Sequence, residues 1–141
     1  MLLCNICKEV HTFDVNESHL EQVRKNAEYF ELKNIIIKKA DAYEKLPIKN
    51  ADLVLLDLPE PWRAINPADE ALKIGGFIVT YCPQITQAQM FVNELMKLPN
   101  YIQVKSVEVV ERDWKIEGQI VRPRSLSNIH SGFITIVRKI N

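Results

Sequence analysis

The sequence predicts an α/β fold built on a doubly wound, parallel sheet. Segments rich in β-branched or aliphatic residues at 10–15, 34–38 and 51–57 have the length of strands, and a helical pattern separates the first two. An aspartate ends or closely follows each segment: Asp14, Asp41 and Asp57. Strands that alternate with helices and end in polar residues are typical of doubly wound sheets.

The bulk properties fit one globular domain. At 141 residues the chain is expected to form a single domain, 1–141, with a buried core. No apolar run approaches the length of a membrane span, and three cysteines fit a reducing compartment, so we expect a cytoplasmic protein. Net charge is zero, but residues 101–141 hold seven Lys or Arg against four Asp or Glu. This weak basic bias permits a polyanionic partner without requiring one.

The first predicted helix follows the strand at 10–15. Residues 16–18 open it, and Ser18 with Glu21 matches a capping box. Its apolar face comprises Leu20, Val23, Ala27 and Phe30. A second helix, rich in Ala and Glu, is predicted at 63–73 and is expected to end at Gly75-Gly76, before a strand at 77–81.

The last third is predicted to be mostly strand. An amphipathic helix at 86–98 precedes it, with an apolar stripe of Ala88, Phe91, Leu95 and Leu98. The long segments 101–112 and 131–139 then predict an antiparallel pair that closes one edge of the sheet.

Cys4 and Cys7 form a C-x-x-C motif, which can indicate zinc or redox chemistry. No second cysteine or histidine pair completes a zinc set. No strand precedes the motif, as a redox site would require. The favoured interpretation is two small, buried residues on a helix, so no metal site is predicted.

The loop at 57–62, with the sequence DLPEPW, is the strongest candidate for a site. It follows an apolar strand, and its two prolines restrict the backbone, so Asp57 is held in one place. Together with Asp14 and Asp41 it would lie at the carboxyl edge of a parallel sheet, where carboxylates can accept hydrogen bonds from the hydroxyl and amino groups of an adenosine-type ligand. The alternative is that these aspartates cap helices.

Several segments, this loop among them, carry a family resemblance. They are DLPEPW at 57–62, ALKIGGF at 71–77, YCPQITQ at 81–87, RDW at 112–114, RPR at 122–124, HSGF at 130–133 and the final Arg138-Lys139. In order and spacing the chain resembles the tRNA (adenine-N1) methyltransferases that modify the T-loop, particularly the archaeal ones. The resemblance spans essentially the whole chain.

The resemblance implies a Rossmann-like, seven-stranded sheet that binds S-adenosylmethionine. Asp14 matches the residue that holds the cofactor's ribose hydroxyls, and Asp41 the residue beside its adenine. Asp57 matches the catalytic aspartate facing the target base. We predict that it also contacts the cofactor. A carboxylate there would accept a hydrogen bond from the adenine N6 amino group and select against guanine.

The resemblance also implies a substrate side of the site. Tyr81 matches a catalytic aromatic residue that lines the target pocket and could stack on a flipped base. Pro59, Arg122 and His130 match other substrate-side positions. Ordinary core packing is the alternative for Tyr81 and is the favoured interpretation for Trp114.

One family element has no counterpart in the sequence. No Gly-rich strand–loop–helix precedes Val10, residues 1–8 match the end of the helix after that loop, and the family's N-terminal β domain is absent. The corresponding strand lies between those ending at Asp14 and Asp57, so two unpaired strand edges are expected. We expect a truncated version of a longer protein, or a gap filled by a swapped segment, a second chain or a register shift. A fully paired sheet using residues 1–8 as a strand would contradict this.

Three function hypotheses follow. The first is a tRNA adenine-N1 methyltransferase, which is catalytic when complete and can be inactive as this truncated chain. The second is a non-catalytic RNA-binding or partner subunit of such an enzyme. The third, a methyltransferase for small molecules or proteins, is disfavoured by the segments at 122–124 and 130–133. The resemblance further implies a homo-oligomer, a tetramer with tRNA lying across its subunits.

Overall fold

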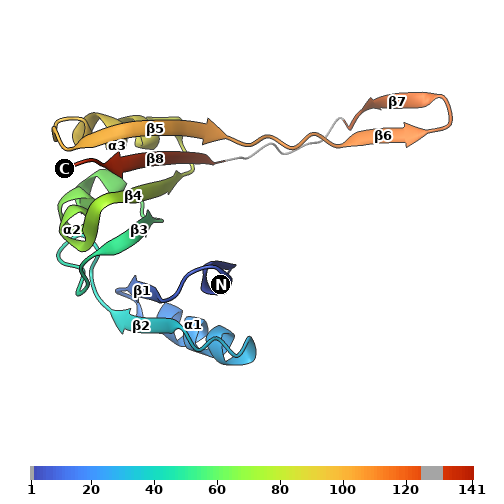
Figure 1. Ribbon diagram of the computed structural model, residues 1–141. Helices are drawn as coiled ribbons and strands as arrows, with labels where there is room; N and C mark the ends of the chain where they lie inside the picture. The colour runs from blue at the N-terminus through green and yellow to red at the C-terminus, as the bar shows by residue number, and fades with distance from the viewer. Residues whose placement is uncertain (1, 125–131) are drawn as a thin grey trace.

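The larger sheet has four strands. The computed structural model describes residues 2–124 and 132–141. Its strand order is β3 (Ala51–Leu56), β4 (Leu72–Cys82), β8 (Phe133–Lys139) and β5 (Tyr101–Glu108). β3 and β4 are parallel, whereas β8 runs antiparallel to both β4 and β5. The predicted antiparallel pair at one edge of the sheet is therefore confirmed (Figure 1).

Two short helices and a 3-10 turn cover one face of this sheet. They are η2 (Pro61–Ala64), α2 (Ile65–Ala71) and α3 (Ile85–Leu95). Val54 and Leu56 point into the core beneath them, whereas Leu53 and Leu55, on the other face, remain exposed. Ala88, Phe91 and Leu95 are buried, as the predicted stripe requires, although the helix itself ends at Leu95.

The boundary between α2 and β4 differs from the prediction. The helix ends at Ala71 rather than at the glycine pair, and Leu72 already pairs with Ala51 of β3. The register then shifts, and Leu53 pairs with Phe77. Gly75 has φ +82°, a conformation that glycine adopts without strain, so the pair shapes an irregularity inside the strand instead of ending the helix.

A smaller sheet contains β1 (Val10–Asp14) and β2 (Ile35–Lys39), paired in parallel and connected by α1 (Glu17–Tyr29). Leu20 and Ala27 of α1 are buried, but Phe30 is 59% exposed and does not join the predicted face. The expected Ser18–Glu21 capping box is also wrong. Asn16 is the N-cap, and its side-chain oxygen accepts hydrogen bonds from the backbone and hydroxyl of Ser18.

The two sheets do not pair with each other. Within the described residues, β1 pairs only with β2, and β3 only with β4. Leu2–Asn5 forms a 3-10 helix, η1, and no strand. The prediction of two unpaired strand edges is confirmed, and Figure 1 shows β1 and β2 set apart from β3. None of the described helices has the length and apolarity needed to cross a membrane.

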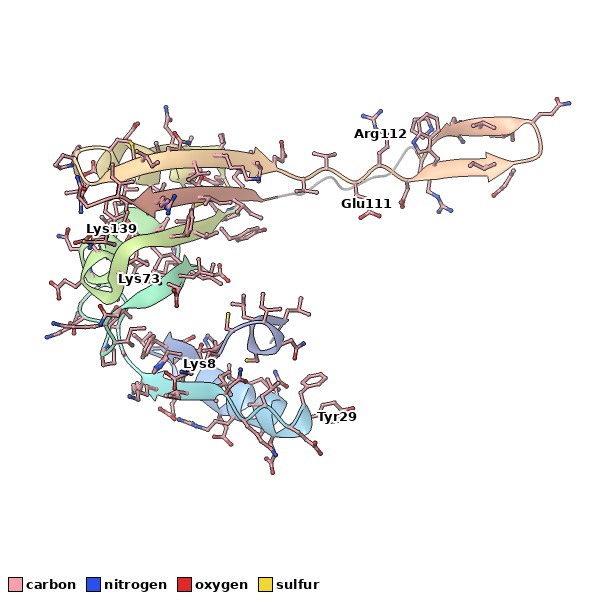
Figure 2. The ribbon with its side chains drawn as sticks, viewed as in Figure 1. Lys8, Tyr29, Lys73, Glu111, Arg112 and Lys139 are labelled. Atoms are coloured by element: carbon pink, nitrogen blue, oxygen red, sulfur yellow. The ribbon has the colours of Figure 1, made fainter. Side chains whose placement is uncertain are left out.

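A β-hairpin that the sequence analysis did not predict projects from the larger sheet. It consists of β6 (Trp114–Glu117) and β7 (Ile120–Pro123), joined through Gly118, which has φ +58° (Figure 1). We call residues 109–124 the arm. Trp114 is 52% exposed there, so its predicted core packing is wrong. In Figure 2, the side chains of Glu111 and Arg112 point to opposite sides of the stretch that leads to the hairpin.

Candidate active site

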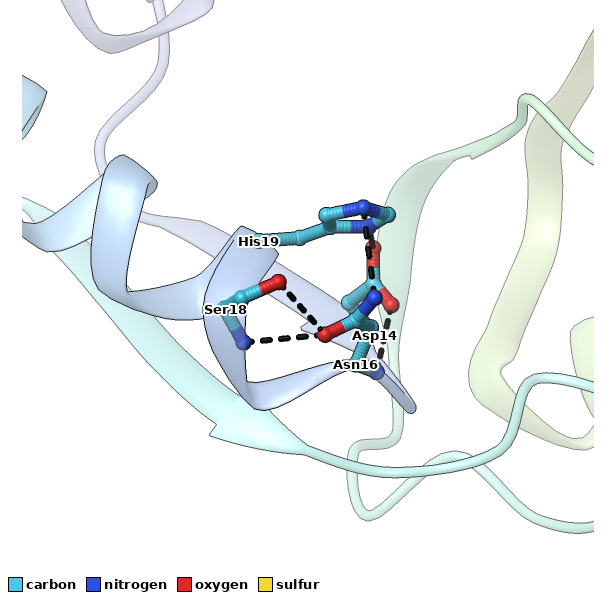
Figure 3. A network of polar contacts seen from close by, with 4 residues as sticks. All are labelled: Asp14, Asn16, Ser18 and His19. Atoms are coloured by element: carbon cyan, nitrogen blue, oxygen red, sulfur yellow. Dashed lines mark hydrogen bonds and ion pairs between the residues drawn. The ribbon is translucent and has the colours of Figure 1, made fainter.

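Asp14 lies at the carboxyl end of β1 in a network of polar contacts (Figure 3). Its Oδ1 accepts a hydrogen bond from the backbone N–H of Asn16 at 2.7 Å, and its Oδ2 lies 3.0 Å from Nδ1 of His19. The hydrogen bond from the Asn16 N–H contributes most to holding the pKa of Asp14 below its ordinary value. Desolvation by burial opposes this effect, and His19 adds to the lowering. The carboxylate is therefore stabilised in its charged form.

Asp41 shares this edge of the smaller sheet. Asp14 lies opposite Lys39 in the parallel register, and the backbone N–H of Ala40 donates to the Asp14 carbonyl at 3.3 Å. Asp41 therefore follows immediately beside the end of β1. Its Oδ1 accepts from the backbone N–H of Tyr43 at 2.8 Å. The structure thus places Asp14 and Asp41 at the ends of adjacent strands, whereas Asp57, the third carboxylate expected at the same edge, follows β3 of the other sheet.

Asp57 follows β3 and is exposed at the start of the DLPEPW loop. It does not cap the next helix, because η2 begins after Glu60 and has no side-chain cap. The helix-cap alternative for this residue is therefore wrong. Within the described part of the chain, no other group bonds to its carboxylate.

The loop around Asp57 is held from two directions. From α3, Nε2 of Gln87 donates to the carbonyl oxygen of Pro59 at 2.9 Å. From the other side, the Glu60 backbone N–H donates to the Tyr43 hydroxyl at 3.3 Å. Arg63 pairs with Glu60 at 2.6 Å and stacks its guanidinium 4.7 Å from the centre of the Tyr43 ring. These contacts add to the stiffness that the prolines impose.

Tyr43 connects the two halves of the candidate site. It lies two residues after Asp41 and contacts the loop that begins at Asp57, so the loops after β2 and β3 are in direct contact. No sequence motif points to Tyr43 or His19, and Gln87, although it ends the YCPQITQ segment at 81–87, has no predicted role. Their roles rest on contacts between distant segments, which motif spacing does not encode; only the position of Tyr43 beside Asp41 gave a signal.

Tyr81, near the end of β4, is 46% exposed, so the core-packing alternative is wrong for this residue. Its ring lies against Gly132: a Cβ built at Gly132 would be 2.1 Å from Cε2 of Tyr81. Position 132 must therefore remain a glycine if the ring is to keep this place.

The remaining predicted site residues are not gathered here. Arg122 lies on β7, opposite Lys115, and Figure 1 places this hairpin far from β3 and β4. The chain does not bring Arg122 to its own Asp57. His130 lies outside the described residues.

The C-x-x-C motif lies in and after η1. Cys4 is buried and Cys7 half-buried, and the backbone carbonyls of both accept hydrogen bonds from Nδ2 of Asn34, at 2.8 and 2.9 Å. In residues 2–124 and 132–141 no group of three His, Cys, Asp or Glu side chains is arranged to hold a metal ion.

Comparison with known proteins gives a consistent result. A family model described as "tRNA methyltransferase complex GCD14 subunit" matches residues 6–135. The chain is 39% identical over 106 residues to the tRNA (adenine(57)-N(1)/adenine(58)-N(1))-methyltransferase TrmI of Methanocaldococcus jannaschii, covering 74% of this chain and 37% of that protein. It is 30% identical over 132 residues to the tRNA (adenine(58)-N(1))-methyltransferase TrmI of Thermus thermophilus, covering 92% and 51%. The chain thus spans about half, or less, of the length of these relatives.

Solved structures show the same fold. A SAM-dependent O-methyltransferase from Thermotoga maritima superposes with a TM-score of 0.84 at 28% identity, covering 94% of this chain and 50% of that chain. The tRNA (m1A58) methyltransferase TrmI from Aquifex aeolicus gives 0.82 at 22% identity, covering 99% and 57%. The predicted Rossmann-like methyltransferase fold is confirmed.

Proposed function

Because the chain belongs to the tRNA methyltransferase complex GCD14 subunit family, we propose that it contributes the catalytic site of a tRNA adenine-N1 methyltransferase. The methyl donor in this proposal is S-adenosylmethionine, and the target base lies in the T-loop. The observation that supports it best is the exposed carboxylate of Asp57. Its loop is held by hydrogen bonds to Gln87 and to Tyr43, which lies two residues after Asp41.

The residues present fit the adenosine half of that donor. Asp14 is charged, partly exposed and retains acceptor positions on both oxygens, as binding of two ribose hydroxyls requires. Asp41 has one oxygen bound by the Tyr43 N–H and the other open to a nearby adenine. When bound, the donor supplies an electrophilic methyl group on a sulfonium centre.

Asp57 suits the reaction at the base. The lone pair of adenine N1 attacks the methyl group, a bond to carbon forms as the carbon–sulfur bond breaks, and positive charge develops on the ring. This charge makes the N6 amino protons more acidic. A carboxylate accepting a hydrogen bond from N6 stabilises the developing charge and orients the ring. Guanine presents a carbonyl at the same position and is repelled. The ring of Tyr81, backed by Gly132, would stack on the base.

The test compares Asp57→Asn with Glu60→Gln in transfer of a labelled methyl group to unmodified tRNA. Asp57→Asn is expected to lower kcat by about 100-fold or more, because it removes the charge that faces N6. Glu60→Gln changes a carboxylate in the same loop whose partner is the exposed Arg63, and should retain activity. Full activity in Asp57→Asn, or no transfer by the unmodified chain, would contradict the proposal.

We further propose that the chain acts in the cytoplasm as a homo-oligomer, a tetramer with tRNA lying across its subunits. Two features support assembly through the arm. In the β6–β7 register, Trp114, Ile116, Val121 and Pro123 share one apolar face that is largely exposed. Arg122, a substrate-side candidate, lies on the opposite face with Lys115, far from Asp57 of its own chain. In such an assembly, a second copy of the chain covers the apolar face of the arm. The Arg122 of the first copy then lies near the Asp57 site of the second copy.

Two substitutions in the hairpin test this assembly. Ile116→Lys places a charge on the apolar face, whereas Ile120→Lys places the same charge on the opposite face, beside Glu117. Light scattering coupled to size-exclusion chromatography should show an oligomer for the unmodified chain and for Ile120→Lys, and a smaller species for Ile116→Lys. A monomeric unmodified chain, or equal behaviour of both variants, would contradict the proposal.

A further inference from the structure

His19 closes a ring of hydrogen bonds around Asp14 (Figure 3). Its Nδ1 lies 3.0 Å from Oδ2 of Asp14, and its Nε2 lies 3.3 Å from Nδ2 of Asn16. The Asn16 backbone N–H completes the ring by donating to Oδ1 of Asp14 at 2.7 Å. No motif identified in the sequence includes His19, which lies in the first turn of α1.

The partners fix the direction of each bond. Oδ1 of Asn16 accepts from both the N–H and the hydroxyl of Ser18, so the other end of this amide, Nδ2, faces His19. Nδ2 can only donate, so Nε2 of His19 must accept. In the neutral ring the proton is therefore on Nδ1, which donates to Asp14. Helix capping by Asn16 thus selects the tautomer of His19.

This arrangement leaves a defined set of acceptor positions on Asp14. A carboxylate offers roughly four acceptor positions, two on each oxygen. Asn16 occupies one on Oδ1 and His19 one on Oδ2, which leaves one on each oxygen and fixes the side-chain rotamer. The side chain is 36% exposed, so the two remaining positions are accessible. A pair of acceptors on adjacent oxygens matches two neighbouring hydroxyl groups.

We propose that His19 is a positioning residue that presents the Asp14 carboxylate to the vicinal diol of a bound nucleoside. The inference rests on the proposed function, because it takes Asp14 as the ribose-binding residue. It adds that recognition of the diol depends on a donor at the Nδ1 position of residue 19. The Asn16 N–H alone leaves one oxygen of Asp14 without a fixed partner, so the rotamer would be less restricted.

The test uses two ligands and two variants of the full chain. His19→Asn retains a donor close to the position of Nδ1, whereas His19→Leu has a similar size and no donor. The ligands are adenosine and 2′,3′-dideoxyadenosine, which lacks the diol. NMR titration of the unmodified chain should show tighter binding of adenosine. His19→Leu should lower the affinity for adenosine by about 5- to 10-fold, the effect of one lost hydrogen bond. It should leave the affinity for the dideoxynucleoside unchanged. His19→Asn should remain within about twofold of the unmodified chain.

The outcomes separate this inference from the proposed function. If the unmodified chain binds neither ligand, or does not distinguish them, the ribose-binding role of Asp14 is wrong and the inference falls with it. If the unmodified chain distinguishes them but His19→Leu has no effect, or weakens both equally, only the positioning role is overturned. The ring nitrogen shifts of His19 in the free protein give an independent result: a proton on Nε2 in the neutral ring would overturn the inference without any ligand.

Discussion

At the scale of single residues, the aspartates of this chain have different surroundings and different consequences. The Asp57 carboxylate is exposed and bonds to no other described group, whereas the Asp69 carboxylate in α2 is held firmly. Its Oδ1 accepts from the Tyr101 hydroxyl at 2.7 Å and pairs with Nζ of Lys139 at 2.8 Å. Lys139 also donates to the Asp69 backbone carbonyl. These contacts tie α2 to the edge strand β5 and to its neighbour β8, so Asp69 is structural.

Removing the Asp69 charge should make stability less dependent on pH. Burial alone would raise the pKa of Asp69. Hydrogen bonds from Lys139 and Tyr101, together with the charge of Lys139, outweigh burial and hold the pKa below the ordinary value. A depressed pKa stabilises the fold above the unfolded-state value, near 3.9, and this stabilisation is lost as pH falls through the folded-state value. Asp69→Asn should lower the free energy of unfolding by about 1–2 kcal/mol at pH 7, allowing for partial exposure.

Urea denaturation of both proteins at several pH values checks this expectation. The difference between the unmodified chain and Asp69→Asn should be constant above about pH 5 and shrink as pH falls below about 4. Asp52→Asn is a suitable control, because Asp52 pairs with Lys73 at the surface and its side chain is 84% exposed. That variant should show no measurable change. A difference that grows toward low pH would show that Asp69 is not held as a charged group.

The sequence identified carboxylates more readily than their partners. Asp14, Asp41 and Asp57 were predictable because each stands at a strand end, which the local apolar pattern reveals. His19 and Gln87 were not, because a polar residue on a helix surface has no periodic signature. Their contacts depend on the angle at which each helix leaves its strand, which only the folded chain defines.

At the scale of the elements, Gln87 connects α3 to the DLPEPW loop. Its Oε1 accepts from the Gln84 backbone N–H at 3.1 Å, which stabilises the helix N-terminus, while its Nε2 donates to the Pro59 carbonyl. One side chain therefore contributes to two elements. The two functions can be separated because one uses the amide oxygen and the other the amide nitrogen.

Gln87→Glu retains the acceptor for Gln84 but replaces the donor to Pro59 with a repelling oxygen. It should leave helix stability nearly unchanged and increase hydrogen exchange at the loop amides of Leu58, Glu60 and Trp62. Gln87→Ala loses both bonds and should also lower the free energy of unfolding by about 1 kcal/mol. Thermal unfolding and exchange followed by mass spectrometry measure the two effects. Equal exchange in all three proteins would show that the Gln87 contact does not restrain the loop, and that the prolines and the Tyr43 contact are sufficient.

The sequence predicts the order of the elements more accurately than it predicts their boundaries. The strands at 10–15, 34–38 and 51–57 lie within a residue or two of their observed limits, because short runs of β-branched and aliphatic residues favour the extended conformation. The end of α2 was misplaced because pairing of Leu72 with Ala51 outweighs local helix preference. The hairpin in the arm was missed although Gly118-Gln119 offers a two-residue turn, since its apolar residues lack a core to face.

At the scale of the whole molecule, the four-stranded sheet and the β1–β2 sheet of the described chain pair separately and have unequal cores, and the β6–β7 hairpin is a third sheet. The main core comprises residues between Val54 and Val137, packed around Phe91 and Leu95. The β1–α1–β2 unit contributes no residue to that buried cluster and has only Leu20, Ala27 and the neighbouring Cys4 buried in it. The composition predicted one core for one domain. It could not show that the unpaired edges of β1 and β3 would leave the apolar residues in two groups.

This division predicts that the smaller unit opens before the larger one. Burial of apolar area is the main stabilising contribution, and the β1–α1–β2 unit buries less of it. Amides of β2 should therefore exchange at lower guanidinium concentration than amides of β4 and β8. Leu20→Ala, which removes the largest buried side chain of α1, should destabilise the unit by about 2–4 kcal/mol and leave exchange in β4 unchanged. Phe91→Ala should accelerate exchange in β4 and β8. A single transition shared by all strands, or an effect of Leu20→Ala on β4, would show that the two sheets form one cooperative unit.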